Sequence, residues 1–339
     1  MTTGLVSDER FHRHRAPYEH PEHPGRLQAI ESRLEGEGLT ARCSRVAARE
    51  ARRDELGRIH TARHIEAIER TAGDGYRQLD PDTYTSPDSA AAAKLAAGAL
   101  IDLTDEVAAG RLRNGLALVR PPGHHAEADA AMGFCLFNNV AIAAAAARAG
   151  GTERVLIVDW DLHHGNGTQR SFWDDPSVLY FSTHQFPFYP GTGGIGEVGG
   201  SAARGRTVNL PWSGGMGDAE YLAAFRRVLL PIARRFAPDL VLVSCGFDAA
   251  AGDPLGSMRV SQEGFAGLTA ELQPLASGRI VLALEGGYNL EAISRDAEAC
   301  LRVLLGEPAP AAEERPVSPV AERVIEAVLE TQRPYWPTV

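Results

Sequence analysis

The sequence predicts a three-layer α/β/α fold around a central, mainly parallel sheet. Short apolar runs recur along the chain with little polar alternation, as parallel strands that are covered on both faces require. Helix-compatible stretches separate these runs, and alternation of strands with helices is typical of α/β folds. The chain has 339 residues, 44% of them hydrophobic, which is enough to bury such a core without disulfides.

The predicted strands are leucine-rich or β-branched runs that end at Asp, Gly, Pro or His. In order they are residues 116–119, 155–158, 178–181, 207–210, 240–243 and 280–284. The helices expected between them are residues 88–109, 138–149, 218–236, 262–277 and 290–305. The stretch 41–66 is arginine-rich and irregular in pattern, so we expect it to lie on the surface.

The organisation along the chain indicates one catalytic domain over residues 1–305. Residues 306–319 are rich in Pro, Ala and Glu and have the composition of a linker. A short helix at about 320–330 is expected inside a C-terminal segment, 320–339, where it would pack on its own domain or on a neighbouring copy. The oligomeric state is open.

Composition narrows the class of protein. The four cysteines are scattered without a CxxC pair, so a reducing, cytoplasmic location is expected. The first residues turn polar quickly, and no apolar stretch approaches 18 residues, so neither a signal peptide nor a membrane partner is predicted. A formal net charge of −10 argues against direct nucleic-acid binding and suits a basic substrate.

Polar and ionisable residues follow the predicted strands in four segments. These are residues 120–126 (RPPGHHA), 159–167 (DWDLHHGNG), 245–256 (CGFDAAAGDPLG) and 284–290 (LEGGYNL). Ligands of open parallel sheets bind beyond the carboxyl ends of the strands, so these segments are expected to form one site.

A metal site is predicted around DWDLHH. If the strand continues to His163, alternation puts Asp159, Asp161 and His163 on one face. Asp161, His163 and Asp248 would then form a mononuclear site with open positions; zinc is favoured and Fe²⁺ fits the same ligands. The alternative is an Asp/His cluster that caps loops, but acidic side chains in an apolar setting are costly unless they are paired or bind a metal.

Proton transfer and oxyanion stabilisation have candidates nearby. His124 and His125 are suited to acid and base roles in amide hydrolysis. Asp159 is expected to pair with one of them, and Asn166 to hydrogen-bond the other without stabilising its charge. Tyr288 follows two glycines and is suited to donate to a developing oxyanion; alone, it would more simply be a packing tyrosine.

Two loops are expected to form the walls of a narrow tunnel. Gly133 and Phe134 lie in one loop, and Tyr189 lies in FYPGTG. Aromatic walls suit the methylene stem of a lysine or a polyamine. Ordinary hydrophobic anchoring of these loops is an equally good alternative.

With these motifs together, the chain resembles the zinc-dependent histone deacetylase and acetylpolyamine amidohydrolase superfamily, which has the arginase-like fold. It looks closest to class II. The resemblance runs from TGLVSDER through HPEHPGR to about residue 305, and RPPGHHAE, VDWDLHHGNGTQ, GFDAAAGDPLG and LEGGYNL carry it. It implies a deacetylase that acts on acetylated lysine or a small acetylated amine.

The resemblance assigns roles to individual residues. It implies that zinc is bound by Asp161, His163 and Asp248, and that Tyr288 polarises the carbonyl. His124 matches the histidine that pairs with a buried aspartate, here Asp159, and His125 matches the general base and acid, partnered by Asn166. Which histidine protonates the amine stays open. Further positions that the resemblance implies are the tunnel walls Phe134 and Tyr189, the substrate-binding Asp82, Arg26 at the foot of the pocket, and a structural K⁺ held by Asp159, Asp161, His163, Ser182 and Thr183.

Two departures from subfamilies bear on activity. Weakly active class IIa members carry histidine at the position of Tyr288, so real turnover is predicted here. Class II polyamine deacetylases carry glutamate in GDPxG, where this chain has Leu255. Acetyl-lysine or a neutral acyl amide is therefore favoured over an acetylpolyamine, which is kept as the alternative.

Three rival interpretations remain to be weighed. A binuclear manganese ureohydrolase needs a bridging carboxylate where this chain has Gly165, which argues against it. A module that only binds acyl ligands is disfavoured by the complete set of ligands, histidines and Tyr288. A deacylase with a preference for longer acyl chains is compatible with the sequence.

Overall fold

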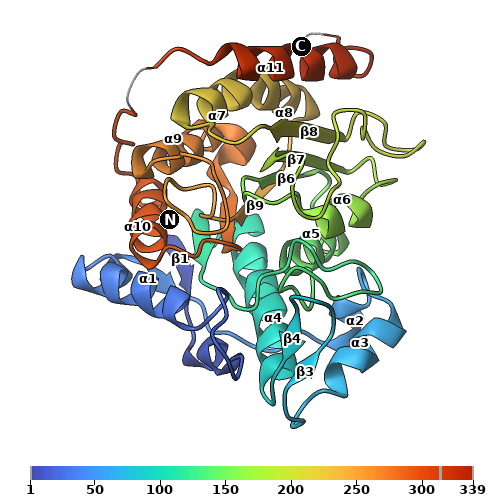
Figure 1. Cartoon of the computed structure of the whole chain (residues 1–339), viewed down its shortest axis with the longest axis vertical. Helices are drawn as coiled ribbons and strands as arrows, with labels where there is room; N and C mark the ends of the chain where they lie inside the picture. The colour runs from blue at the N-terminus through green and yellow to red at the C-terminus, as the bar shows by residue number, and fades with distance from the viewer. Residues whose placement is uncertain (1, 313–314, 338–339) are drawn as a thin grey trace.

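A computed structural model describes residues 2–312 and 315–337 of the chain. Within these ranges, the centre is one sheet of eight strands in the order β2–β1–β5–β10–β9–β6–β7–β8, and every pairing in it is parallel. A separate antiparallel ribbon consists of β3 and β4. Helices flank the sheet (Figure 1). The predicted three-layer α/β/α fold is therefore confirmed.

The elements have the following bounds. The strands are β1 (Thr3–Val6), β2 (Ser44–Arg45), β3 (Arg77–Gln78), β4 (Tyr84–Thr85), β5 (Asn114–Ala117), β6 (Val155–Asp159), β7 (Val178–Gln185), β8 (Thr207–Trp212), β9 (Leu240–Cys245) and β10 (Ile280–Leu284). The helices are α1 (Gly25–Gly36), α2 (Arg53–Leu56), α3 (Ala62–Glu69), α4 (Ser89–Ala108), α5 (Asn139–Ala149), α6 (Asn166–Ser171), α7 (Asp218–Ala224), the π-helical turn η3 (Phe225–Leu229), α8 (Leu230–Phe236), α9 (Gln262–Leu272), α10 (Leu290–Leu304) and α11 (Pro319–Gln332).

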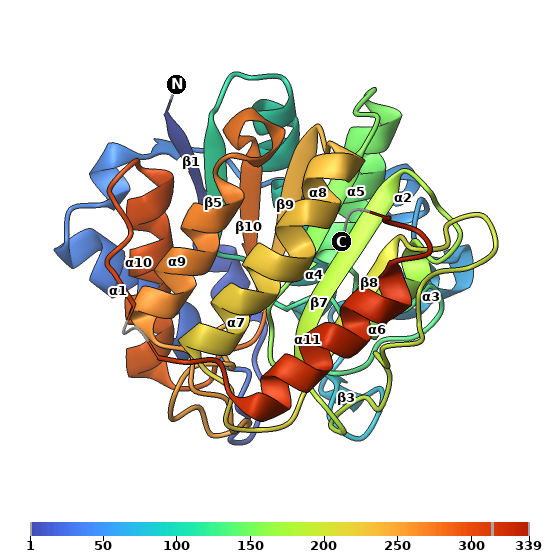
Figure 2. The ribbon, with the colours of Figure 1, turned by 90° about the horizontal axis from the view of Figure 1, so that it is seen from above.

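Helices cover both faces of the sheet. α4 contacts β1, β5 and β10, and α5 contacts β6 and β9, so these two helices form one layer. α1, α10 and α9 pack in series in the opposite layer, followed by α7, η3 and α8 (Figure 2). Every residue of β6, β9 and β10 is buried, which explains why these strands are continuous apolar runs in the sequence.

Two short strands contain a glycine: β1 was not predicted, and β5 was predicted two residues too late. β5 begins at Asn114, two residues before the predicted start, and also ends two residues earlier than predicted. A β-carbon at Gly115 would lie 2.6 Å from Leu103 of α4, and one at Gly4 of β1 would lie 2.5 Å from the same side chain. The two glycines therefore allow α4 to approach the sheet closely. In the sequence, glycine more often indicates a turn than a strand, so these positions were not predicted as strand residues.

The helix predicted at 218–236 is present over these residues, as α7, the π-helical turn η3 and α8 in direct succession. Two other local predictions are wrong. The helix expected at 262–277 stops at Leu272, and Ala276 and Ser277 have φ of 48° and 57°. The stretch 41–66 is not purely irregular surface: it contains β2, α2 and part of α3, and it buries Leu56 and Ile65.

The C-terminal helix α11 packs on its own domain, beside β8 and η3 (Figure 1). Gln332 Nε2 donates to the carbonyl of Thr207 at 2.9 Å, and Trp336 Nε1 donates to Gly205 at the same distance. The division at 305 and 319 stays a prediction, and the expected linker includes residues 313–314, which lie outside the described residues. Every helix in the described ranges is too short or too polar to span a bilayer.

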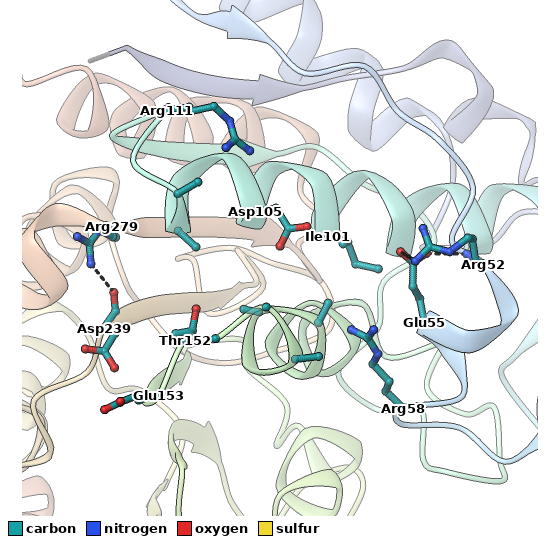
Figure 3. A pocket seen from close by; sticks show the side chains of 17 residues that line it. Arg52, Glu55, Arg58, Ile101, Asp105, Arg111, Thr152, Glu153, Asp239 and Arg279 are labelled. Atoms are coloured by element: carbon teal, nitrogen blue, oxygen red, sulfur yellow. Dashed lines mark hydrogen bonds and ion pairs between the residues drawn. The ribbon is translucent and has the colours of Figure 1, made fainter.

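A cavity of about 750 Å³ lies at the amino edge of the sheet, between the C-terminal ends of α4 and α5 (Figure 3). Two of its arginines have partners within the lining: Arg52 pairs with Glu55 at 2.8 Å, and Arg279 donates to the Asp239 carbonyl. In open α/β sheets, ligands generally bind beyond the carboxyl ends of the strands. The active site is therefore expected at the opposite edge of the sheet from this cavity.

Candidate active site

The loops that follow β6, β9 and β10 meet at the carboxyl edge of the sheet. β6 ends at Asp159, so the predicted continuation of the strand to His163 is wrong. The chain bends after Trp160, and this bend, not strand alternation, directs Asp161 and His163. Asp161 is tied across the edge because its Oδ2 accepts a hydrogen bond from the backbone N–H of Gly286 at 2.8 Å.

Asp161, His163 and Asp248 converge on one point. His163 Nδ1 lies 3.2 Å from Asp161 Oδ1 and 3.1 Å from Asp248 Oδ2, and the three ligand atoms all lie within 4.8 Å of one another. Asp161 and Asp248 are buried. Two carboxylate oxygens and one imidazole nitrogen that face a common point match the donor set of a mononuclear divalent-metal site.

The charges of this cluster are strongly coupled. Burial and the neighbouring charge of Asp161 raise the pKa of Asp248 to about 7. Burial alone would lower the pKa of His163, but its hydrogen bonds to the two carboxylates outweigh that effect and raise it to about 10. Two buried carboxylates this close repel each other, so a cation between them is electrostatically favourable.

His124 is held as part of a buried ion pair. Its Nδ1 lies 3.1 Å from Asp159 Oδ2, and the same oxygen accepts from the Tyr180 hydroxyl at 3.0 Å. Burial opposes the charged ring, yet the charges of Asp161 and Asp159 prevail and raise the pKa of His124 to about 10. The pairing with Asp159 therefore favours the charged form of the His124 ring.

His125 has the opposite environment. Its Nδ1 lies 2.8 Å from Asn166 Oδ1, while Asn166 Nδ2 donates to Glu127 at 2.7 Å. The amide orientation makes Oδ1 the acceptor, so the proton of His125 is on Nδ1 and Nε2 keeps its lone pair. Burial and the positive charges of His124 and His163 hold the pKa of His125 well below its usual value.

Tyr288 faces the same pocket from the loop after β10. The Arg26 guanidinium lies 4.9 Å from the centre of its ring, and Arg26 Nε donates to the Gly287 carbonyl at 2.6 Å. Burial raises the pKa of Tyr288 well above its usual value. Its hydroxyl has no hydrogen-bond partner among the described residues, so it is free to donate to a ligand.

A narrow pocket of about 250 Å³ leads to these groups. Phe134 meets Tyr288 edge-on with ring centres 5.9 Å apart, and Tyr189 meets His125 edge-on at 5.1 Å. The residues that line the pocket are Asp82, Pro122, His124, His125, Gly133, Phe134, His163, Phe188, Tyr189, Leu255, Gly286 and Tyr288. All five residues predicted to contact substrate are among them.

Asp82 supports the pocket wall. Its Oδ1 accepts from the backbone N–H of Gly133 at 3.2 Å and from the Thr83 hydroxyl at 2.9 Å. Phe134, which follows, has φ of 68°, a conformation that non-glycine residues seldom adopt. The wall is therefore held by hydrogen bonds in a strained backbone.

The two outer residues of the predicted K⁺ set lie on β7. Ser182 pairs with Asp159 in the strand register, and its hydroxyl lies 2.9 Å from His184 Nδ1. The hydroxyl oxygen of Thr183 is buried and has no hydrogen-bond partner among the described residues.

Two pocket features were missed by sequence reasoning. Phe188 lines the pocket and stacks on His163, with ring centres 5.6 Å apart; its place before Tyr189 in FPFYPG is the signal that was available. Glu285 is buried, and its Oε2 accepts from the N–H groups of Gly123 and His124 at 2.6 and 3.2 Å. It therefore anchors the histidine loop, and a charged residue directly after an apolar strand was its signal.

A parallel three-layer α/β fold, with a two-carboxylate, one-histidine cluster at the foot of a pocket, defines the arginase/deacetylase-like class of α/β proteins. Residues 20–304 match the model of the histone deacetylase domain family. The chain therefore belongs to the histone deacetylase family.

Individual relatives agree with this assignment. The chain is 46% identical to Histone deacetylase 15 of Arabidopsis thaliana, covering all of this chain and 63% of that protein. It is 44% identical to Histone deacetylase 7 of Homo sapiens, covering 99% of this chain and 40% of that one. The crystal structure of the HDA15 HD domain has a TM-score of 0.95 and 46% identity, with 99% of this chain and 96% of that chain covered. The chain thus spans less than two thirds of these two full-length relatives.

The rival ureohydrolase site is excluded by space as well as by residue type. A β-carbon at Gly165 would lie 2.2 Å from Asp159 Oδ2 and 2.8 Å from the Tyr180 hydroxyl. No bridging carboxylate fits at this position without displacing the partner of His124.

Proposed function

We propose that this chain is a zinc-dependent deacetylase that hydrolyses N-ε-acetyl-lysine, or a similar acyl amide, to acetate and a free amine. The observation that carries the proposal is the convergence of Asp161, His163 and Asp248 at the foot of a pocket that also contains two histidines and Tyr288. Membership of the histone deacetylase family supports the same reaction.

Asp161, His163 and Asp248 would hold the metal, and their open side faces the pocket. Two carboxylates and one imidazole suit zinc, and Fe²⁺ is the alternative. When bound, the metal supplies a Lewis acid that activates water and polarises the scissile carbonyl.

His125 takes the proton of the attacking water. Its Nδ1–H is engaged by Asn166, so the lone pair on Nε2 is available, and its low pKa keeps the ring neutral at physiological pH. A base in this state is ready before the reaction begins.

His124 contributes charge. Its ion pair with Asp159 keeps an imidazolium beside the position where negative charge develops in the transition state. The ring centres of His124 and His125 are 4.0 Å apart and both residues line the pocket, so either is placed to protonate the departing amine.

Tyr288 stabilises the tetrahedral oxyanion through its hydroxyl, to which no described residue is hydrogen-bonded. One such donor contributes about 3–4 kcal/mol to catalysis. Its presence supports genuine turnover in place of ligand binding alone.

The pocket favours acetyl-lysine as the substrate. The aromatic rings of Phe134 and Tyr189 suit the methylene stem, and Leu255 presents an apolar side chain where a second ammonium group would need a carboxylate. An acetylpolyamine is the alternative substrate. A structural K⁺ beside Asp159 is a further part of the proposal, supported by the buried hydroxyl oxygen of Thr183, which has no hydrogen-bond partner within the described ranges.

Steady-state turnover by zinc-reconstituted protein tests the proposal, with an acetyl-lysine peptide and N8-acetylspermidine assayed side by side. The expected result is turnover that a chelator abolishes and that favours the peptide. Faster turnover of the acetylpolyamine would support the proposed deacetylase reaction but contradict acetyl-lysine as the preferred substrate. If the zinc-bound protein hydrolyses neither the peptide nor N8-acetylspermidine, the proposed deacetylase activity is contradicted. A module that only binds acyl ligands would then be favoured.

A further inference from the structure

The loops after β9 and β10 are joined through one carboxylate, Asp253. Its Oδ2 accepts from the backbone N–H of Tyr288 at 2.7 Å and of Asn289 at 3.1 Å. Its Oδ1 accepts from the backbone N–H of Leu255 at 2.9 Å. The Asn289 side chain adds a further bond between the loops, since Nδ2 donates to the Gly252 carbonyl at 3.1 Å.

This carboxylate is committed to backbone amides. Asp253 is only 6% exposed, and within the described ranges it forms no ion pair with a basic side chain. Burying a carboxylate is costly unless strong hydrogen bonds compensate. The three N–H groups that it accepts from are therefore the interactions that fix its place.

The loop that carries Tyr288 has few other restraints on that residue. Gly286 and Gly287 precede it, and Gly287 has φ of 115°, which only glycine adopts readily. The Gly286 N–H is held by Asp161 and the Gly287 carbonyl by Arg26. The N–H of Tyr288 itself is held by Asp253.

Asp253 also reaches the rim of the pocket. Leu255, whose N–H it holds, lines the same cavity as Tyr288. One carboxylate therefore binds the backbone of both segments.

We infer that Asp253 is a positioning residue that sets the location of the Tyr288 hydroxyl relative to the bound carbonyl, and that it couples this location to the rim at Leu255. The inference rests on the proposed oxyanion role of Tyr288. Asp253 is not among the described residues that line the pocket.

The test uses the full chain with Asp253→Ala, and with Asp253→Asn as a milder second variant. Hydrogen–deuterium exchange of the segment 284–290 is expected to accelerate at least tenfold in Asp253→Ala. On the acetyl-lysine peptide, kcat should fall about 10- to 100-fold, a part of the effect of losing one oxyanion donor, with KM within about threefold. Asp253→Asn keeps one acceptor oxygen and should lie between the wild type and the alanine variant.

A double-mutant cycle separates positioning from general destabilisation. In a Tyr288→Phe background, Asp253→Ala should lower kcat less than twofold further, because residues that act as one unit are non-additive. Asp218 is the matched control: it also ties a loop through backbone and side-chain bonds to Ser261, and Asp218→Ala should leave kcat within about twofold.

The outcomes are distinct. Equal kcat losses from Asp253→Ala in the wild-type and Tyr288→Phe backgrounds would overturn the inference, as would unchanged exchange of 284–290. If wild-type protein shows no turnover, the proposed function fails, while exchange still decides whether Asp253 holds the Tyr288 backbone.

Discussion

Gly133 lies directly against the ring of His125: a β-carbon at residue 133 would come 2.4 Å from Cδ2 of that ring. The backbone of Gly133 has φ of 56°. The wall of the pocket and the neutral histidine are therefore packed as one unit, with no space for even a methyl group between them.

Gly133→Ala is expected to lower kcat at least tenfold, because the methyl group displaces His125 from its bond with Asn166. The positive φ adds a conformational cost of roughly 1–2 kcal/mol. Gly73→Ala is the control, since Gly73 has φ of 76° but no neighbouring atom within 4 Å. Kinetics and thermal unfolding of both variants separate the two effects, and equal kcat values in the two variants would contradict the prediction.

Tyr288→Phe is expected to lower kcat about 100- to 1000-fold, the loss typical of removing one oxyanion donor. Bound metal should not change, since the hydroxyl belongs to none of the three converging ligands. Metal analysis and steady-state kinetics check both points. Tyr335→Phe, remote from the pocket, controls for loss of a phenol; near-normal turnover of Tyr288→Phe would remove the proposed role.

Leu255→Glu is expected to raise acetylpolyamine turnover relative to acetyl-lysine, because it adds a carboxylate to a pocket wall that is apolar at this point. A severalfold change in the ratio of the two kcat/KM values is the measured quantity. Leu290→Glu places the same charge at an exposed leucine outside the pocket lining and should leave the ratio unaltered. No gain for the polyamine would show that this position does not select the substrate.

Zinc is expected to raise the Tm of wild-type protein, because a ligand that binds only the folded state contributes about 2.7 kcal/mol at a hundred times its Kd. Asp248→Asn should abolish this increase, since it removes one of the three converging ligand atoms. Thermal melts with zinc and with chelator measure the effect. An undiminished zinc response in Asp248→Asn would refute the assigned metal site, and Asp296→Asn serves as the control that should keep it.

Asp296 is expected to make stability fall with rising pH. Burial, with further contributions from Glu263 and Asp218, raises its pKa from 3.8 to about 8, and its Oδ2 is buried without a hydrogen-bond partner among the described residues. The folded state therefore binds the proton more tightly, so the destabilisation is absent below about pH 4 and grows up to about pH 8.

Asp296→Asn should consequently stabilise the protein more at pH 8 than at pH 5. Urea unfolding at the two pH values gives the difference in free energy of unfolding between variant and wild type. A difference that does not depend on pH would show that Asp296 ionises normally.

Much of the fold follows from local patterns. The strands β6, β9 and β10 were predictable because both of their faces are buried, so each is an uninterrupted apolar run. The amphipathic pattern of residues 41–66 was obscured by arginines, which pair at the surface while Leu56 and Ile65 turn inward.

The sequence by itself determined the fold class and the types of residue at the site: two carboxylates and a histidine, a histidine pair, and a tyrosine after glycines, each beyond an apolar strand. Their chemical roles stay proposals. Only the tertiary structure decided that Gly115 of β5 lies against Leu103, that Asn166 fixes the proton of His125 on Nδ1, and that Asp253 holds Tyr288. Periodicity reports what is local, whereas these contacts depend on how closely segments distant in the sequence approach one another.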